Sequence, residues 1–100
     1  MRIHFMRSGG FAGLSTSADI DSDRLPPDEA QTLQEEVAQA NFFELPSRIP
    51  ARAIGVDRFQ YAITIQDGSE VHTVEVGEAD MPGALQPLVQ HLSRLARARR

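Results

Sequence analysis

The side chains best suited to metal binding or proton transfer in this 100-residue sequence are three histidines. They fall on three different predicted elements, at His4, His72 and His91. A zinc site needs several ligands at one point, and the sequence has no cysteine to add to them. We therefore interpret them as surface histidines, except that His72 falls on the apolar side of its strand and should be partly buried. We expect no metal and no cofactor.

Two short polar clusters also suggest chemistry. Acidic residues alternate as in a calcium-binding loop at Asp19, Asp21 and Asp23, but the glycine and the later glutamate of such a loop are missing. The hydroxyls of residues 15–17 have no neighbouring base that would activate a nucleophile. The sequence also lacks the helical zinc motif, the phosphate-binding glycine loop and the serine elbow of known enzyme classes. It therefore predicts that the protein is not an enzyme, and that the three aspartates keep it soluble or screen an edge strand.

The segment Arg7-Ser-Gly-Gly-Phe-Ala-Gly-Leu14 is the most unusual part of the sequence. Gly9, Gly10 and Gly13 cost backbone entropy, and a connection that only reversed the chain would not need three of them. Small residues around Phe11 would let the backbone approach another surface closely while presenting one apolar anchor. Alternatively, the glycines accommodate a bulged, left-handed connection and Phe11 folds back onto the core. The residues alone favour these two interpretations equally.

The charges and the apolar pattern exclude several kinds of partner. All ten basic residues are arginines, and the formal net charge is −4. No aromatic residues lie between the arginines of the C-terminal end, from about 94 to 100, on which nucleic-acid bases could stack. We interpret these arginines as complementing a helix dipole and as a soluble tail, and expect no nucleic-acid partner. No apolar run approaches the ~18 residues that a membrane helix needs, and no signal peptide is evident, so we expect a soluble cytoplasmic protein without a membrane partner.

The predicted elements in the first half of the chain are two strands and a helix. Residues Arg2–Arg7 and Leu14–Ile20 alternate as strands do, and should form a hairpin around the glycine-rich segment. Prolines and acids at Leu25–Ala30 are typical of a helix start. The helix carries one apolar stripe at spacings of three and four, formed by Ala30, Leu33, Val37 and Ala40. Three apolar residues that follow it beside a proline are expected in the core: Phe42, Phe43 and Leu45.

A second hairpin is predicted over residues 59–76, where apolar and polar residues alternate on both sides of Asp67-Gly68. That dipeptide is a favoured hairpin turn. If it forms the whole turn, both apolar series share one face of the sheet. The expected facing pairs are then Ile65 with Glu70, Ile63 with His72, Tyr61 with Val74, and Phe59 with Val76.

The last predicted element is a helix from about Leu85 to Arg97, with Pro87 in its first turn or at a kink. Its leucines recur at helical intervals and form an apolar stripe. The element order is therefore β-β-α-β-β-α. We predict an α+β fold in which two hairpins form a four-stranded antiparallel sheet with two helices packed on one face, all within a single domain over residues 1–100.

Several segments together resemble one family of proteins. They are the opening MRIHFMRSGGFAGL, the helix start LPPDEA, the exit NFFELP, and the hairpin DRFQYAITIQDG…HTVEV. This combination is similar to emfourin, a protein inhibitor of thermolysin-like zinc metalloproteases of the protealysin type. The resemblance runs from Met1 to about Leu95. One departure lies on the first helix: Glu36 is an acid at a position where an apolar residue would be ordinary.

The resemblance implies that this chain binds a protealysin-like protease and blocks its active-site cleft. On that basis we expect the glycine-rich segment to enter or cap the cleft, with Phe11 as the anchor and Arg7 paired with a carboxylate at the cleft wall. The expected partner-binding residues are Arg7, Ser8, Gly9, Gly10, Phe11, Ala12 and Gly13. A second contact patch is a candidate at Asp57 and Arg58, although a solvated turn is the favoured interpretation there.

The alternative function is a non-inhibitory interaction module, such as a subunit that escorts or regulates a partner protease. A purified chain that inhibits such a protease stoichiometrically would separate the two. We expect a monomer when the protein is free, because charges at the hairpin edges disfavour edge-to-edge pairing.

Overall fold

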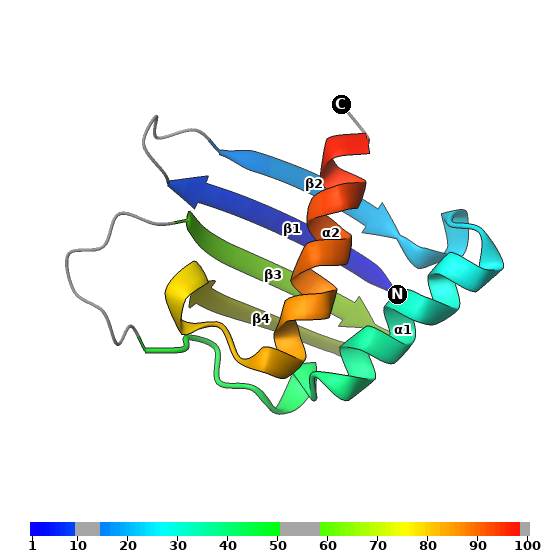
Figure 1. The fold of residues 1–100 in the computed structure, drawn as a ribbon. Helices are drawn as coiled ribbons and strands as arrows, with labels where there is room; N and C mark the ends of the chain where they lie inside the picture. Colours follow the sequence, from blue (N-terminus) through cyan, green and yellow to red (C-terminus); the bar gives the residue numbers. More distant parts are fainter. Residues whose placement is uncertain (10–14, 51–58, 99–100) are drawn as a thin grey trace.

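The computed structural model describes residues 1–9, 15–50 and 59–98 of the chain. Its main elements follow the predicted order, and short 3-10 turns lie before and after α1 and between β4 and α2 (Figure 1). They are β1 (Arg2–Gly9), β2 (Thr16–Asp21), α1 (Pro27–Gln39), β3 (Phe59–Asp67), β4 (Glu70–Gly77) and α2 (Gln86–Ala98). Among the described residues, no helix is long and apolar enough to cross a membrane.

The four strands form one antiparallel sheet in the order β2-β1-β3-β4. Strand β1 lies in the interior of the sheet, and its alternating apolar residues meet apolar residues on both sides. Ile3 pairs with Ile20 of β2 and with Ile65 of β3. This cross-strand matching is the unit that stabilises a sheet and sets its register. The predicted α+β fold of two hairpins and two helices is confirmed.

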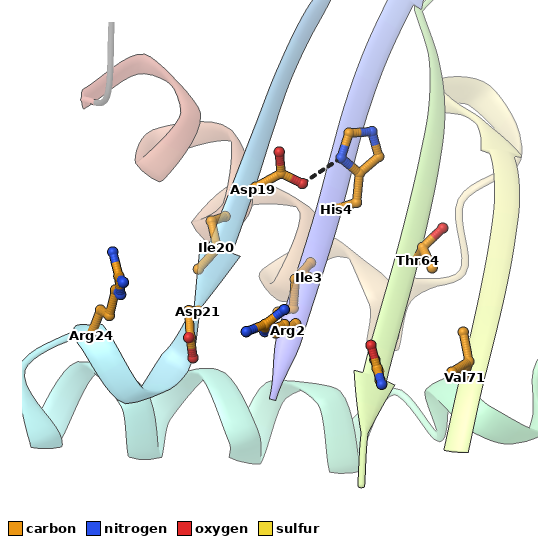
Figure 2. Close-up of a pocket in the computed structure, with 10 residues that line it drawn as sticks. Arg2, Ile3, His4, Asp19, Ile20, Asp21, Arg24, Thr64 and Val71 are labelled. Atoms are coloured by element: carbon orange, nitrogen blue, oxygen red, sulfur yellow. Dashed lines mark hydrogen bonds and ion pairs between the residues drawn. The ribbon is translucent and has the colours of Figure 1, made fainter. Parts of the chain in front are cut away.

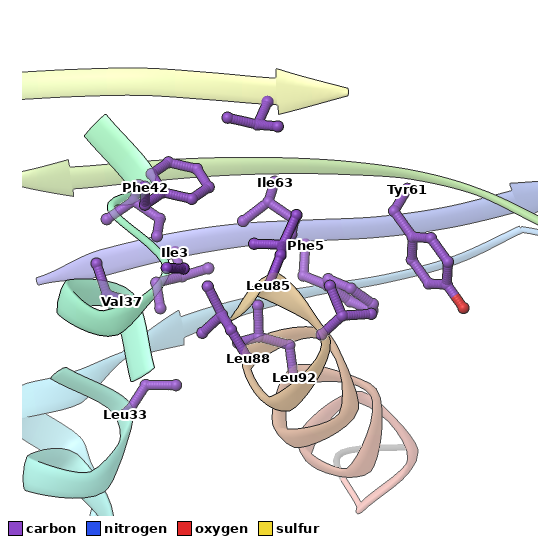
Figure 3. Close-up of a cluster of buried hydrophobic side chains, with 14 of the residues drawn as sticks. Ile3, Phe5, Leu33, Val37, Phe42, Tyr61, Ile63, Leu85, Leu88 and Leu92 are labelled. Carbon is purple, nitrogen blue, oxygen red and sulfur yellow. The ribbon is translucent and has the colours of Figure 1, made fainter. Parts of the chain in front are cut away.

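Both helices cover the same face of the sheet (Figure 1). The core between sheet and helices joins the inward residues of all four strands to the apolar stripes of α1 and α2 (Figure 3). Its completely or almost completely buried side chains include Phe5, Phe42, Ile63, Leu33, Leu85, Leu88 and Leu92. The opposite face of the sheet carries alternating polar residues, with Met6 and Val71 as its exposed large apolar side chains among the described residues.

The second hairpin has a register different from the predicted one. Asp67 pairs with Glu70, so the two turn residues are Gly68 and Ser69 rather than Asp67 and Gly68. Ile63 therefore faces Val74, and Ile65 faces His72. Gly68 has a φ of 63°, a conformation that glycine adopts without strain. As the first of the two turn residues, it supplies the positive φ that the turn needs. The error is a shift of two residues, which leaves every side chain on its predicted face.

The helix ends follow the local sequence. Pro27 occupies the first position of α1, where its missing N–H has no intrahelical partner to lose. Asn41 follows the last turn of α1 with φ 49° and ψ 46°, the left-handed conformation that commonly ends a helix. Pro87 is the second residue of α2, as one of the two predicted alternatives required.

Two of the three histidines are built into the fold. The Nε2 atom of His72 donates to the carbonyl oxygen of Leu45 at 2.7 Å, and the ring packs against Phe42 and Phe43. Phe42 is fully buried, whereas Phe43 and Leu45 are half-buried against the core. The expectation that His72 is partly buried is confirmed.

His91 contradicts the prediction of a surface histidine, because only 5% of the residue is exposed. Its Nδ1 atom lies 2.7 Å from Oε1 of Glu36, and its Nε2 atom lies 3.4 Å from Oε2 of Glu29. His91 thus sits on the apolar face of α2 and ties it to α1, with Glu36 as its partner. The unexpected acid at position 36 has a structural purpose, because a buried polar ring needs hydrogen-bond partners.

Candidate functional site

The structure describes three of the residues that the sequence placed in a binding loop. Arg7, Ser8 and Gly9 are the last residues of β1, and all three are half-buried. Four more residues of that expected set lie outside the described residues: Gly10, Phe11, Ala12 and Gly13. The candidate second patch, Asp57 and Arg58, also lies outside them.

The register of β1 with β3 brings these two parts of the sequence to the same end of the sheet. Arg7 pairs with Tyr61, Ser8 with Gln60, and Gly9 with Phe59. Gly9 is the last described residue of the first predicted contact segment, and Phe59 directly follows the second; the two are therefore direct neighbours (Figure 1). Sequence reasoning had assigned the segments to the ends of different hairpins, and the pairing of β1 with β3 makes them adjacent.

Gly9 has a φ of 96°, a backbone conformation that side chains with a Cβ rarely adopt. At this position the glycine therefore has a conformational reason that is independent of any partner. The interpretation of the glycines as accommodating a left-handed connection is supported for Gly9. Gly9 is the last residue of β1.

The side chain of Arg7 lies over an aromatic ring of its own molecule. Its guanidinium carbon is 4.7 Å from the centroid of the Phe59 ring, within the range of a cation–π contact. Because Arg7 pairs with Tyr61, the ring of Phe59 is the diagonal neighbour two residues away on β3. The arginine thus connects the end of β1 to the start of β3.

Tyr61 lies at one end of the buried cluster beside Arg7 (Figure 3). Burial raises the pKa of its phenol above the ordinary value, and the negative charge of Glu78 raises it further. The positive charge of Arg7 and its hydrogen bond to the phenol act in the opposite direction and lower this pKa. The phenol is therefore neutral at physiological pH, and the group is a structural one with an electrostatic link to Arg7.

We name the described part of this surface the β1–β3 rim, and define it as Arg7, Ser8, Gly9, Phe59 and Tyr61. An arginine, two aromatic rings and a close-approaching backbone are the materials from which protein-binding hot spots are made. Sequence reasoning found the first three residues through the glycine-rich pattern. It missed Phe59 and Tyr61 as members of a site, because the alternation of that strand indicated core residues alone.

A hollow on the uncovered sheet face is a weaker candidate for a functional site than the β1–β3 rim (Figure 2). It has a volume of about 430 Å³ and is lined mainly by polar side chains, including Arg2, Asp21 and Thr64. A hydrogen bond of 2.7 Å joins His4 Nδ1 to Asp19 Oδ1 within it, but both side chains are well exposed to water. Among residues 1–9, 15–50 and 59–98, no three histidine or acidic side chains are grouped in a way that could hold a metal ion.

Comparison with known proteins identifies the family. A family model described as Emfourin matches residues 5–93, and the chain belongs to the emfourin family. The matched region contains every residue of the β1–β3 rim. Emfourins are protease inhibitors, and membership suggests the same role for this chain and a protease as its partner. No curated protein matches the chain, and no solved structure does so.

Proposed function

We propose that this protein inhibits a thermolysin-like zinc metalloprotease of the protealysin type by docking the glycine-rich connection of its first hairpin over the active-site cleft. The observation that carries the proposal is the family match over residues 5–93, which includes the whole segment Arg7–Gly13. The bound surface begins at Ser8 and Gly9 of the β1–β3 rim and continues through Phe11.

The chemistry of the target explains why a small plug is sufficient. Proteases of this class hold zinc through two histidines and a glutamate and use a bound water as the nucleophile. They favour a bulky apolar side chain just after the scissile bond. An inhibitor that fills this pocket with Phe11, or that covers the approach of the water, competes with the substrate without taking part in the reaction.

The described residues support this proposal by providing a rigid base. Strand β1 is paired with β2 through Arg7 and with β3 through Gly9. Phe5, in the same strand, is 1% exposed and anchors it in the core. A loop held at a rigid strand loses less conformational entropy on binding than a free peptide does, which favours affinity.

Asp57 and Arg58 are proposed as a second contact. They directly precede Phe59, whose partner Gly9 belongs to the rim. A protease that covers Gly9 would therefore meet the chain at the start of β3 as well. Charged residues at the edge of an interface influence association rate and specificity more than they influence affinity.

The decisive experiment is a titration of a purified protealysin-like protease with the purified chain, followed by peptidase activity. We expect stoichiometric loss of activity. The variant Phe11→Ala should weaken inhibition by at least ~1.5 kcal/mol, about twelvefold, while the melting temperature stays nearly constant. Val71→Ala is the matched control, because it also truncates an apolar side chain but lies in the second hairpin, where Val71 is 61% exposed. This variant should inhibit as the wild type does.

Two results would contradict the proposal. If Phe11→Ala lowers the melting temperature strongly and leaves inhibition unchanged, Phe11 belongs to the core. If the chain binds the protease and peptidase activity is unaffected, the protein is an escort or regulatory module rather than an inhibitor.

A further inference from the structure

The side chain of Arg7 already has partners within the chain. It was expected to reach a carboxylate on the protease, but its guanidinium lies over the ring of Phe59, and Tyr61 is its direct neighbour across the strand pair. Both aromatic residues belong to β3, so one side chain of β1 contacts two residues of the neighbouring strand. A guanidinium is suited to this because it is planar and can stack on a ring while its N–H groups donate at the edge.

The contact lies where β1 ends and β3 begins. Gly9 is the last residue of β1 and Phe59 is the first residue of β3, and the two are paired. Gly9 has no side chain with which to hold this pair together. Arg7, two residues earlier on the same side of the strand, reaches diagonally to the ring of Phe59 and supplies the missing side-chain contact.

The surroundings favour a contact that stays within the molecule. Arg7 is half-buried, and Tyr61 beside it is only 8% exposed. A cation over a ring is held more strongly as water is excluded. To reach a carboxylate on another protein, the guanidinium would have to leave the aromatic ring over which it already lies.

We propose that Arg7 is a positioning residue for inhibition, whose guanidinium holds Phe59 and Tyr61 against the end of β1 and so fixes the strand ends next to the docking segments. This inference rests on the proposed function and deepens it. Arg7 acts through Phe59 and Tyr61 and not through a contact of its own with the protease.

The first test compares two arginines of the same strand. Arg7→Gln removes the charge and the planar fork and should raise the inhibition constant about tenfold, a mid-range coupling between contacting residues. Arg2→Gln removes the same charge from the other end of β1, on the uncovered sheet face, and should stay within about twofold of the wild type. If Arg7→Gln inhibits as well as Arg2→Gln does, the inference is wrong.

A double-mutant cycle separates positioning from direct contact. Phe59→Leu keeps an apolar side chain at the start of β3 but removes the aromatic face. If Arg7 acts through that ring, Arg7→Gln should have little further effect on inhibition in the Phe59→Leu background. An undiminished tenfold effect in that background would show that the ring of Phe59 does not carry the effect of Arg7, and would overturn the inference.

A third measurement needs no protease. Tyr61 is the only tyrosine of the sequence, so tyrosinate absorbance during an alkaline titration reports this residue alone. Arg7 lowers the pKa of the Tyr61 phenol, and Arg7→Gln should therefore shift its titration to higher pH, whereas Arg2→Gln should leave it unchanged. If the Tyr61 titration is the same in Arg7→Gln as in the wild type, the contact between Arg7 and Tyr61 does not persist in solution. Arg7→Lys, which keeps the charge, extends the test if Arg7→Gln folds poorly.

The failures of the two proposals are distinguishable. A wild-type chain that binds no metalloprotease would overturn both of them. A wild-type chain that inhibits, together with an Arg7→Gln variant that inhibits equally well, would overturn the positioning role alone.

Discussion

The two hairpins of the sheet both reverse the direction of the chain, but they do so with connections of different length. In the second hairpin Asp67 pairs with Glu70, and only Gly68 and Ser69 connect the strands. In the first hairpin the last pair among the described residues is Arg7 with Thr16, and β1 continues beside β3 to Gly9. This sheet can reverse a chain with two residues, and the proposed docking role gives the longer glycine-rich connection a purpose other than reversal.

The surroundings of the two connections differ in the same direction. The turn of the second hairpin is flanked by the exposed acids Asp67 and Glu70. The first hairpin leaves the sheet at the β1–β3 rim, where an arginine lies over an aromatic ring. Arginine and aromatic residues are enriched in protein-binding hot spots, whereas acids are depleted from interface centres. One end of the sheet thus carries a closed turn, and the other end is the base on which the proposed docking segment stands.

The largest expected effect comes from exchanging the connection of the first hairpin. Replacing residues 10–13 by a glycine–serine linker of equal length should reduce inhibition by about a hundredfold or more, because it removes the proposed anchor. The melting temperature should change little, since loop closure depends only weakly on loop composition and length. Activity titration and thermal unfolding would be measured on the same preparation.

The second hairpin provides the control for this exchange. The same linker inserted between Gly68 and Ser69 should leave inhibition intact. If the variant with the replaced first connection inhibits undiminished while folded, the contrast between the two hairpins has no functional meaning.

An intermediate effect is expected from the two glycines that have positive φ in the described part of the chain, one in each hairpin. Gly9→Ala, at φ 96°, should cost about 2 kcal/mol of folding free energy, and Gly68→Ala, at φ 63°, about 1 kcal/mol. Only Gly9→Ala should also weaken inhibition, because it alters the rim. Chemical denaturation together with inhibition constants would test both statements.

Gly83→Ala is the matched control for this pair. Like Gly68, Gly83 has open space where a Cβ would be placed, but it lacks a positive φ. Its substitution should be neutral or slightly stabilising. If all three substitutions destabilise the protein equally, the positive φ of Gly9 and Gly68 is not the cause of the destabilisation.

The smallest expected effect is the loss of stability at alkaline pH that Tyr61 causes. Because the pKa of Tyr61 is raised in the folded protein, folding favours the neutral phenol, and stability falls as the pH rises past the unfolded value of 10. The sequence has no lysine or cysteine that would titrate in this range. Tyr61→Phe should flatten the decline in denaturation experiments at a series of pH values, and an unchanged decline would show that the phenol at the rim is not buried in solution.

The element order and the faces of the elements were predictable from local patterns. Alternation put Ile3 and Phe5 on one face of a strand, and the spacing of Leu88 and Leu92 defined the apolar stripe of a helix. Both patterns reflect the periods of regular backbone structure, which need no knowledge of neighbours. The register of the second hairpin was predictable only to within two residues, because a shift of two residues leaves every side chain on the same face of the sheet. The residue that adopts a positive φ decides between the two registers.

The polar contacts of the interior depended on tertiary structure. His91 was interpreted as a surface residue although it lies three residues after Leu88, on the face that α2 buries. Its partner Glu36 is 55 positions away in the sequence. A partner at that distance has no local signal, because it depends on how α1 and α2 pack. The same reason explains why Phe59 was missed as a neighbour of Arg7.

The sequence by itself determined which residues turn inward, where the helices begin, and that the first hairpin carries a glycine-rich connection resembling that of emfourins. Tertiary structure alone decided that β1 lies between β2 and β3, and hence that Gly9 meets Phe59 and Arg7 covers its ring. The physical reason is that backbone preference and hydrophobic periodicity act over a few residues. Strand order instead follows from burying all the apolar faces of the chain at once.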